Sequence, residues 1–572
     1  MALQADTKDK TPASDTHVPE LLQRSSTSSP VNGGKTNYGE STDAKPGQSD
    51  VAYDGDVVKH EAVKQGLSSR HLQLMSLAGS IGTGLFLSTG YALGDAGPVG
   101  MLLAYLLMST IVVAVVFSMA ELSALAPTSG SYVRHTGMWI DPSVGFCVGW
   151  NLVFGSAFSA PSTLTSIAVL CQYWKPDLNA AIPITVFLLA TLAANVFKVR
   201  VYGEIEYWFA ILKILTIVGL IIFGFCIDLG GSPSGDLIGF RYWKDPGPFV
   251  SYLVDGPTGV FIGFWSVMTS AAYSFSGLES TAIAAAEVKN PRTAVPEASR
   301  RVFFRVGVIY MASLFVISLI VPSNDENLFA SYGTAATSPF VVAASRAGVK
   351  GVASLVNALI LLSAWSSNNT SLFNGARALL GLALDGKAPK LFAKTHAWGI
   401  PYNGIAAIAI FMPLAYTALS SSATTVFYYF VSIVSASVLT DWFLICVAAI
   451  RLHSALKAQN ISPTRLPFVP WGQPYLSWYG AIGSFVVLLT SGFTLFIGEG
   501  LPNMTATGFL TSYAAPILSF LAFAGHKIVK KTSWPKAADL PVEPWLQHWA
   551  DNPEPPKEKK TAWQTVKAIF WT

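Results

Sequence analysis

Two long apolar stretches of this 572-residue chain are each interrupted by a run rich in glycine and serine. Residues 79–84 (GSIGTG) break the first stretch, and residues 273–280 (YSFSGLES) break the sixth. A backbone N–H or C=O group left bare to lipid costs several kcal/mol, so a broken helix is tolerated at membrane depth only where it lines a cavity inside the protein. Two such breaks, five stretches apart, indicate a membrane protein that holds a solute between its helices, as transporters do.

The composition agrees with a membrane location. The chain is 51% hydrophobic and 12% charged, whereas soluble domains carry about 25% charged residues. Apolar runs long enough to cross about 30 Å of hydrocarbon predict an all-α integral membrane fold of about twelve helices. These are expected at residues 72–92, 98–126, 143–170, 181–197, 206–228, 258–287, 302–322, 351–380, 404–420, 424–450, 477–497 and 510–530. The ninth and tenth stretches are separated only by the polar run 420–422.

Basic residues are distributed unevenly between the connecting loops. If the N-terminus is cytoplasmic, the inner loops hold most of them, and the outer loops hold mainly Lys175, Arg241, Lys244, Arg346 and Lys350. Because cytoplasmic loops are enriched in Lys and Arg, both termini are expected in the cytoplasm.

The chain ends read as tails on either side of one membrane domain. Residues 1–65 are polar and are expected to form a disordered cytoplasmic tail. Residues 66–531 form the membrane domain, and residues 532–572 a C-terminal cytoplasmic tail. No signal peptide is expected, because the first apolar run begins only after Arg70-His71.

The chain shows no pattern typical of an enzyme. It has no nucleophile–base set, no phosphate-cradling loop and no C-x-x-C spacing among its four cysteines, so neither a catalytic activity nor a metal or other cofactor is expected. No nucleic-acid partner is expected either. The lysines of the N-terminal tail are candidate sites for ubiquitin, although any solvated tail carries lysines.

Ionisable residues at membrane depth are costly and usually face a cavity or a partner. Glu121, Lys213, Glu279 and Asp441 are the candidates here. Lys213 lies about two turns from the inner end of its helix, so it either extends to the membrane surface or points inward as an internal cation that exchanges a proton. Glu121 has the same two interpretations, and Asp441 is expected to make a polar contact between helices.

The two breaks have complementary chemistry. The half-helix that starts after the first break presents free amides and a positive dipole end, which suit a carboxylate. Carbonyls that end the helix at the second break suit an ammonium group, so the pair fits the head of an α-amino acid. The alternative is close helix packing around small residues. Tyr273 and Phe275 are the candidate aromatic gates, and Glu279 either caps the unwound backbone or contacts the ligand or a proton.

At these residues the chain resembles the fungal amino acid permeases of the amino acid–polyamine–organocation (APC) superfamily, in the yeast amino acid transporter family. The resemblance is carried by residues 70–74 (RHLQL), 79–86 (GSIGTGLF), 141–146 (DPSVGF), 149–151 (GWN), 201–204 (VYGE), 206–209 (EYWF), 287–292 (EVKNPR), 294–296 (AVP), 386–390 (GKAPK) and 399–403 (GIPYN). It covers roughly residues 66–530. Residues 239–243 (GFRYW), 338–341 (SPFV) and 471–475 (WGQPY) are most similar to the branch that carries proline and small neutral amino acids.

The resemblance implies a LeuT-like fold, in which helices 1–5 are repeated in inverted orientation as helices 6–10 and two helices are added. It also implies proton-coupled import across the plasma membrane. The site residues that it implies are Gly82, Thr83 and Gly84 for the substrate carboxylate, and the carbonyls of Ser80, Tyr273 and Ser276 for its amino group. Ser274, Phe275 and Gly277 complete the predicted binding segment, and Lys213, Glu279 and Glu121 are the predicted proton-coupling residues.

One departure from the family pattern bears on the substrate. Many fungal permeases have a glutamate shortly after a proline in the third helix, but residues 160–164 are APSTL here. The missing acid favours neutral substrates. Transport of γ-aminobutyrate, choline or a polyamine, and a sensor that binds an amino acid without transporting it, remain the alternative functions.

Overall fold

The computed structural model describes residues 82–128, 130–196, 199–233, 235–279, 291–328, 338–349, 351–396, 400–497 and 505–553. The chain separates into two units, Met1–Val51 and Ala52–Thr572, and every described residue belongs to the second. The predicted N-terminal tail therefore lies outside the described residues, as do residues 554–572.

Helices make up nearly all of the regular structure in these ranges, and one isolated bridge joins Leu229 to Leu237. In chain order the main helices are η2 (Gly84–Ser88), α2 (Thr89–Leu125), α3 (Tyr132–Trp139), α4 (Pro142–Gln172), α5 (Ala181–Val196), α6 (Val199–Asp228), α7 (Arg241–Lys244), α8 (Gly256–Phe275), α10 (Pro291–Ile320), η4 (Glu326–Leu328), α11 (Pro339–Arg346), α12 (Val352–Leu384), η5 (Lys390–Ala393), α13 (Tyr402–Ala409), η6 (Met412–Leu419), α14 (Ala423–Ala458), η7 (Pro463–Arg465), α15 (Tyr475–Leu489), η8 (Phe493–Phe496), α16 (Ala506–Lys530), η9 (Ala537–Asp539) and α17 (Val542–Asp551).

Six helical segments within the described residues are long and apolar enough to cross a membrane: Gly84–Leu125, Pro142–Gln172, Glu206–Asp228, Tyr402–Leu419, Ala423–Ala458 and Ala506–Lys530. Three shorter apolar helices, Ala181–Val196, Gly307–Ile320 and Tyr475–Leu489, lie where the sequence predicts further stretches. The architecture is that of a helical membrane protein.

The first of these segments is bent. Gly97 has φ +75° and precedes Pro98, so the ladder of helical hydrogen bonds is broken there. A Cβ on Gly97 would lie 2.9 Å from the Cα of Phe249, which leaves room only for glycine. The amide of Val99 donates instead to the carbonyl of Pro248 at 2.9 Å. The bend separates the first two predicted stretches.

A helix boundary also falls between the ninth and tenth predicted stretches. The ninth consists of α13 followed by the 3₁₀ turns of η6, and α14 begins at Ala423. Ser422 caps α14, because its side-chain oxygen accepts from the amide of Thr425 at 3.1 Å. The polar run 420–422 is therefore a true helix boundary.

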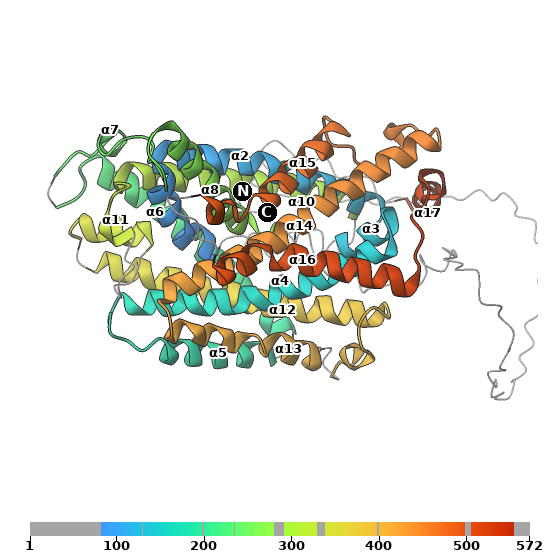
Figure 1. Ribbon diagram of the computed structural model, residues 1–572, viewed down its shortest axis with the longest axis horizontal. Helices are drawn as coiled ribbons and strands as arrows, with labels where there is room; N and C mark the ends of the chain where they lie inside the picture. Colours follow the sequence, from blue (N-terminus) through green and yellow to red (C-terminus); the bar gives the residue numbers. More distant parts are fainter. Residues whose placement is uncertain are drawn as a thin grey trace, which may run out of the picture. The chain divides into compact units, whose positions relative to one another are not determined.

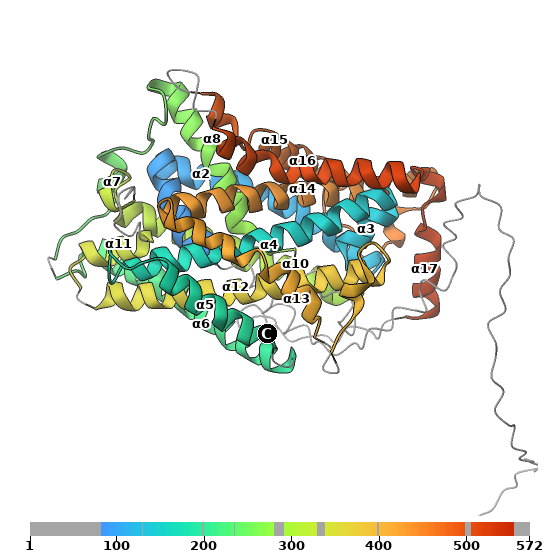
Figure 2. The ribbon, with the colours of Figure 1, turned by 60° about the horizontal axis from the view of Figure 1, so that its bottom comes forward.

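The helices form two packed groups that meet at α14. In one group α2 packs against α8 and α10, and in the other α4 packs against α12 and α14. Helix α14 also contacts α2 and α8, and so joins the groups. Figure 1 shows α4 (cyan) beside α12 (yellow), and Figure 2, turned by 60°, shows α14 (orange) alongside α4.

The described part of the C-terminal tail is packed against the membrane domain. Leu540 and Val542 are buried, and Trp549 of α17 donates its indole N–H to the carbonyl of Leu125 at 2.8 Å. Gln459, just after α14, donates to the carbonyl of Leu540 at 2.7 Å. This segment thus ties together the ends of α2 and α14.

Candidate functional site

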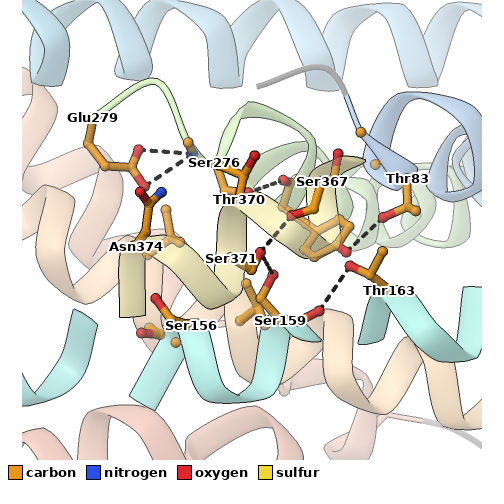
Figure 3. Close-up of a pocket in the computed structure, with 18 of the residues that line it drawn as sticks. Thr83, Ser156, Ser159, Thr163, Ser276, Glu279, Ser367, Thr370, Ser371 and Asn374 are labelled. Carbon is orange, nitrogen blue, oxygen red and sulfur yellow. Dashed lines mark hydrogen bonds between the residues drawn. The ribbon is translucent and has the colours of Figure 1, made fainter. Parts of the chain in front are cut away.

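A polar pocket lies where the two helix groups meet. Its walls come from the segment before α2, from α4, from the end of α8 and from α12 and α14. About 120 Å³ of it is reachable by the centres of water molecules, and a single water needs about 10–15 Å³ on this measure. The pocket is therefore large enough for a small solute. Figure 3 shows Thr83 at one end, and Glu279 and Asn374 turned toward each other at the other end.

The first break forms one end of the pocket. Gly82, Thr83 and Gly84 line it, and helical structure resumes at Gly84. Ser80, the other predicted residue of this break, lies outside the described residues. The residues before Gly82 lie outside the described part of the chain, so the carboxylate site at the amides of this helix stays a prediction.

The second break lies directly against the first. Helix α8 ends at Phe275, Ser276 is extended with φ −60° and ψ 148°, and Gly277 has φ +93°. A Cβ on Gly84 would lie 2.6 Å from the Cα of Ser274, so the two interrupted segments touch through their backbones. Ser274, Ser276 and Gly277 all line the pocket.

Not every predicted carbonyl is available for an ammonium group. The Tyr273 carbonyl accepts from the Ser276 amide at 3.2 Å and from the Ser276 hydroxyl at 2.7 Å. A carbonyl oxygen has two lone pairs, so this acceptor is occupied in the present conformation. The carbonyl of Ser274 likewise accepts from the hydroxyl of Tyr310 at 2.8 Å.

The predicted aromatic gates behave differently from each other. Tyr273 lines the pocket, and its hydroxyl bonds Thr83 at 2.9 Å and Ser162 at 3.3 Å, which connects α8 to the first break and to α4. Phe275 is fully buried and does not line the pocket, because its ring stacks on Tyr310 with a centroid distance of 5.1 Å. Phe275 therefore does not face the pocket in this conformation, and its role at the substrate or at a gate stays a prediction.

Hydroxyl groups that the sequence analysis did not single out cover the remaining walls. They recur at helical spacing, so that each set lies on one face of its helix. Ser159 of α4 and Ser371 of α12 form a hydrogen bond of 2.8 Å where the two helices meet in the pocket wall. The spacing was visible in the sequence, as residues 156, 159 and 163 and residues 367, 370 and 371.

Two carboxylates line the pocket. Glu279 accepts from the Gly277 amide through both oxygens, each at 3.1 Å, and so caps the unwound backbone while facing the cavity. Asp441 accepts from the Asn151 amide group at 2.8 Å. The expected helix contact of Asp441 is present, but this residue also lines the pocket, which the sequence analysis missed. The described lining includes neither Lys nor Arg.

The other two predicted proton-coupling residues lie outside the lining. Lys213 is 1% exposed, so it does not extend to the membrane surface. Its ammonium donates to the hydroxyl of Ser367 at 3.2 Å, and Ser367 lines the pocket, so Lys213 lies one layer behind the wall. Glu121 is buried at the far end of α2 against His453, with 3.0 Å between Oε1 and Nε2, and is not brought to the pocket.

A helical membrane protein with a polar pocket at two interrupted helices belongs to the class of solute transporters. The fold is similar to the crystal structure of the Eremococcus coleocola manganese transporter, with a TM-score of 0.50 and 11% sequence identity. That likeness covers 84% of this chain and 95% of the transporter, and it concerns the fold alone.

The sequence then defines the family. The amino acid permease family model matches residues 71–538, and the chain belongs to this family. It is 40% identical to the proline-specific permease of Emericella nidulans, over 84% of this chain and 88% of that one. It is 35% identical to the dicarboxylic amino acid permease of Saccharomyces cerevisiae (84% and 79%) and 35% identical to the lysine-specific permease of the same organism (89% and 82%). It is thus a multi-pass membrane protein of amino acid transport and not an enzyme.

Proposed function

We propose that this permease imports amino acids across the plasma membrane by proton symport, with alternating access to one central pocket. The observation that carries the proposal is the backbone contact between Gly84 and Ser274. This contact brings the start of one helix and the end of another to the same cavity. The positive partial charge of the helix start suits the carboxylate of an amino acid, and the negative partial charge of the helix end suits its ammonium group.

The proposed topology has twelve membrane helices with both termini in the cytoplasm. The bend at Gly97 divides Gly84–Leu125 into two spans. The other five long segments, the three shorter apolar helices, α8 and α12 bring the proposed number to twelve. The packing of α2, α8 and α10 in one group and of α4 and α12 in another supports a 5+5 inverted repeat with two added helices, since such repeats place the site between the groups. Ubiquitin-dependent turnover through lysines of the N-terminal tail remains part of this proposal.

The proposed route of the proton involves Lys213 and Glu279. Glu279 faces the cavity, and Lys213 reaches the cavity wall through Ser367. Glu121 is a weaker candidate, because it contacts His453 at the end of α2 instead of the pocket. The proton is the only coupling ion in this scheme, and no cofactor takes part.

A neutral, proline-like substrate is favoured by the missing acid in residues 160–164 and by the similarity to a proline-specific permease. A cationic side chain is the second candidate. It is favoured by Glu279 and Asp441, two carboxylates that line a pocket whose described lining has no basic residue.

An uptake panel in a permease-deficient cell tests these proposals. Proline, leucine, lysine, γ-aminobutyrate and choline are each supplied with and without an inward proton gradient. Uptake of proline that rises with the gradient supports the main proposal, and preferential uptake of lysine supports the second candidate. Specific binding of an amino acid without accumulation would instead assign the protein as a sensor.

A further inference from the structure

A buried acid accompanies Lys213 on the same helix. Glu206 is 6% exposed, and its Oε2 accepts from the hydroxyl of Ser366 at 2.8 Å. Thr370, which lines the pocket, also lies against this carboxylate. The second oxygen, Oε1, is buried and has no hydrogen-bond partner among the described residues. Such an atom in a native structure requires an explanation.

Glu206 and Lys213 are seven residues apart, which places them about two turns apart on one face of α6. Both face α12 at consecutive residues, since Glu206 bonds Ser366 and Lys213 bonds Ser367. The two charges interact electrostatically in the interior. A buried ion is stabilised chiefly by an opposite charge nearby, and each of these groups supplies one to the other.

Several charged groups on the neighbouring helices have partners of their own among the described residues. Helix α5 contains no charged residue, and α12 presents hydroxyls to the pair. On α11, Arg346 pairs with Asp325 at 2.6 Å. On α10, Arg292 and Arg300 lie over the rings of Trp549 and Phe468. Among the described residues, Glu206 is thus the acid coupled to Lys213.

We propose that Glu206 is the buried counter-ion of Lys213 and sets the pH range over which Lys213 holds the coupling proton. This inference rests on the proposed proton symport and adds a positioning residue to it. The Glu206 anion stabilises the Lys213 ammonium across the interior of the helix bundle. When the wall at Ser367 and Thr370 moves with the substrate, the same contacts transmit the movement to the pair.

The test is the pH profile of amino acid uptake in Glu206→Gln. The amide keeps the shape of the side chain but removes its charge, so the ammonium loses its proton more readily and needs more acid to regain it. The pH of half-maximal uptake should fall by about one unit. Exchange of internal for external substrate, which needs no net proton movement, should be retained and shows that the protein is folded.

Glu204→Gln is the matched control, because Glu204 lies on the same helix but is exposed. It should leave the pH profile unchanged. Glu206→Asp keeps the negative charge and should therefore show a nearly normal pH profile of uptake. If Glu206→Gln does not reach the membrane, the profile of Glu206→Asp is the one that is measured, and a profile as altered as that of Lys213→Met would contradict the inference. In a Lys213→Met background, which should already lack proton-driven uptake, Glu206→Gln should cause no further change in uptake, since its effect passes through the lysine.

An unchanged profile in Glu206→Gln, or an equal shift in Glu204→Gln, would overturn the inference while leaving proton symport intact. Failure of the proposed function itself looks different, because the unaltered protein would then show no dependence of uptake on the proton gradient.

Discussion

The Tyr273 hydroxyl links the two broken segments through a hydrogen bond of 2.9 Å to Thr83. It also forms a hydrogen bond of 3.3 Å with Ser162 of α4. Tyr273→Phe removes both bonds and keeps the ring against Phe427. Each bond contributes about 1 kcal/mol, so the initial rate of uptake at low substrate should fall by up to about thirtyfold. Measurement of KM and maximal rate checks this.

The matched control is Tyr416→Phe, whose hydroxyl bonds Thr185 at 2.7 Å in an exposed position away from the pocket. Uptake by this variant should equal that of the unaltered protein. Equal losses in the two variants would mean that the Tyr273 hydroxyl has no special part in transport.

Gly84 permits the close backbone approach at the pocket. In Gly84→Ala the new Cβ would lie 2.6 Å from the Cα of Ser274, and backbone atoms cannot move aside as a flexible side chain does. Uptake should fall by at least tenfold even where the protein reaches the membrane, which surface labelling measures. Gly219→Ala, with nothing within 4 Å of its added Cβ, should retain transport.

At the scale of elements, Asp141 fastens the start of α4 to the end of α16. It caps α4 by accepting from the Ser143 amide at 2.7 Å, and it pairs with Lys527 and with Thr532. Burial opposes ionisation, but these hydrogen bonds together hold the pKa of Asp141 below its ordinary value. Asn keeps a capping oxygen but loses the charge that Lys527 pairs with, so Asp141→Asn should lower the free energy of unfolding by about 1–2 kcal/mol at pH 7.

The pH dependence follows from the depressed pKa. The contribution of Asp141 is complete above its unfolded value of about 3.9 and is lost as the pH falls through the lower folded value. The difference in melting temperature between the two proteins in detergent should be constant from pH 8 to pH 5 and shrink below pH 4. A difference that is the same at pH 3.5 and pH 7 would contradict this assignment.

Some helix boundaries were predictable, because they depend on local chemistry. The polar run 420–422 ends one helix and Ser422 caps the next, and the glycine-rich break at residue 84 starts a helix as expected. Whether a side chain points into the pocket or away from it depends instead on tertiary packing. Phe275 and Asp441 show this: the aromatic turned away from the pocket, and the supposed structural acid turned into it.

At the scale of the whole molecule, the described C-terminal segment packs on a basic end of the helices. Arg465 pairs with Glu543 at 2.8 Å, and Arg451 and Arg292 lie over the rings of Trp534 and Trp549. Because cytoplasmic ends are the basic ones, a tag after residue 572 should react with antibody only in permeabilised cells. Labelling of intact cells would reverse the proposed orientation. A tag in the loop after Lys244 serves as the opposite control.

The fold class was predictable from two breaks and from apolar length, because lipid leaves the backbone few alternatives. The residues that form the pocket wall were less predictable. Its hydroxyls come from α4 and α12, which are far apart in sequence, and only their packing brings Ser159 to Ser371.

The contact of Gly84 with Ser274 has a further consequence for selection among solutes. On the proposed function, the backbones that meet at Gly84 and Ser274 fix the span between the groups that receive the carboxylate and the ammonium. An α-amino acid carries both charges on one carbon, whereas γ-aminobutyrate spreads them over a three-carbon chain. The proposed site would therefore select solutes by the distance between their two charges, independently of the side chain. Because main-chain groups set this distance, substitutions in the serine-rich walls should change which amino acid is carried without changing the class of molecule admitted.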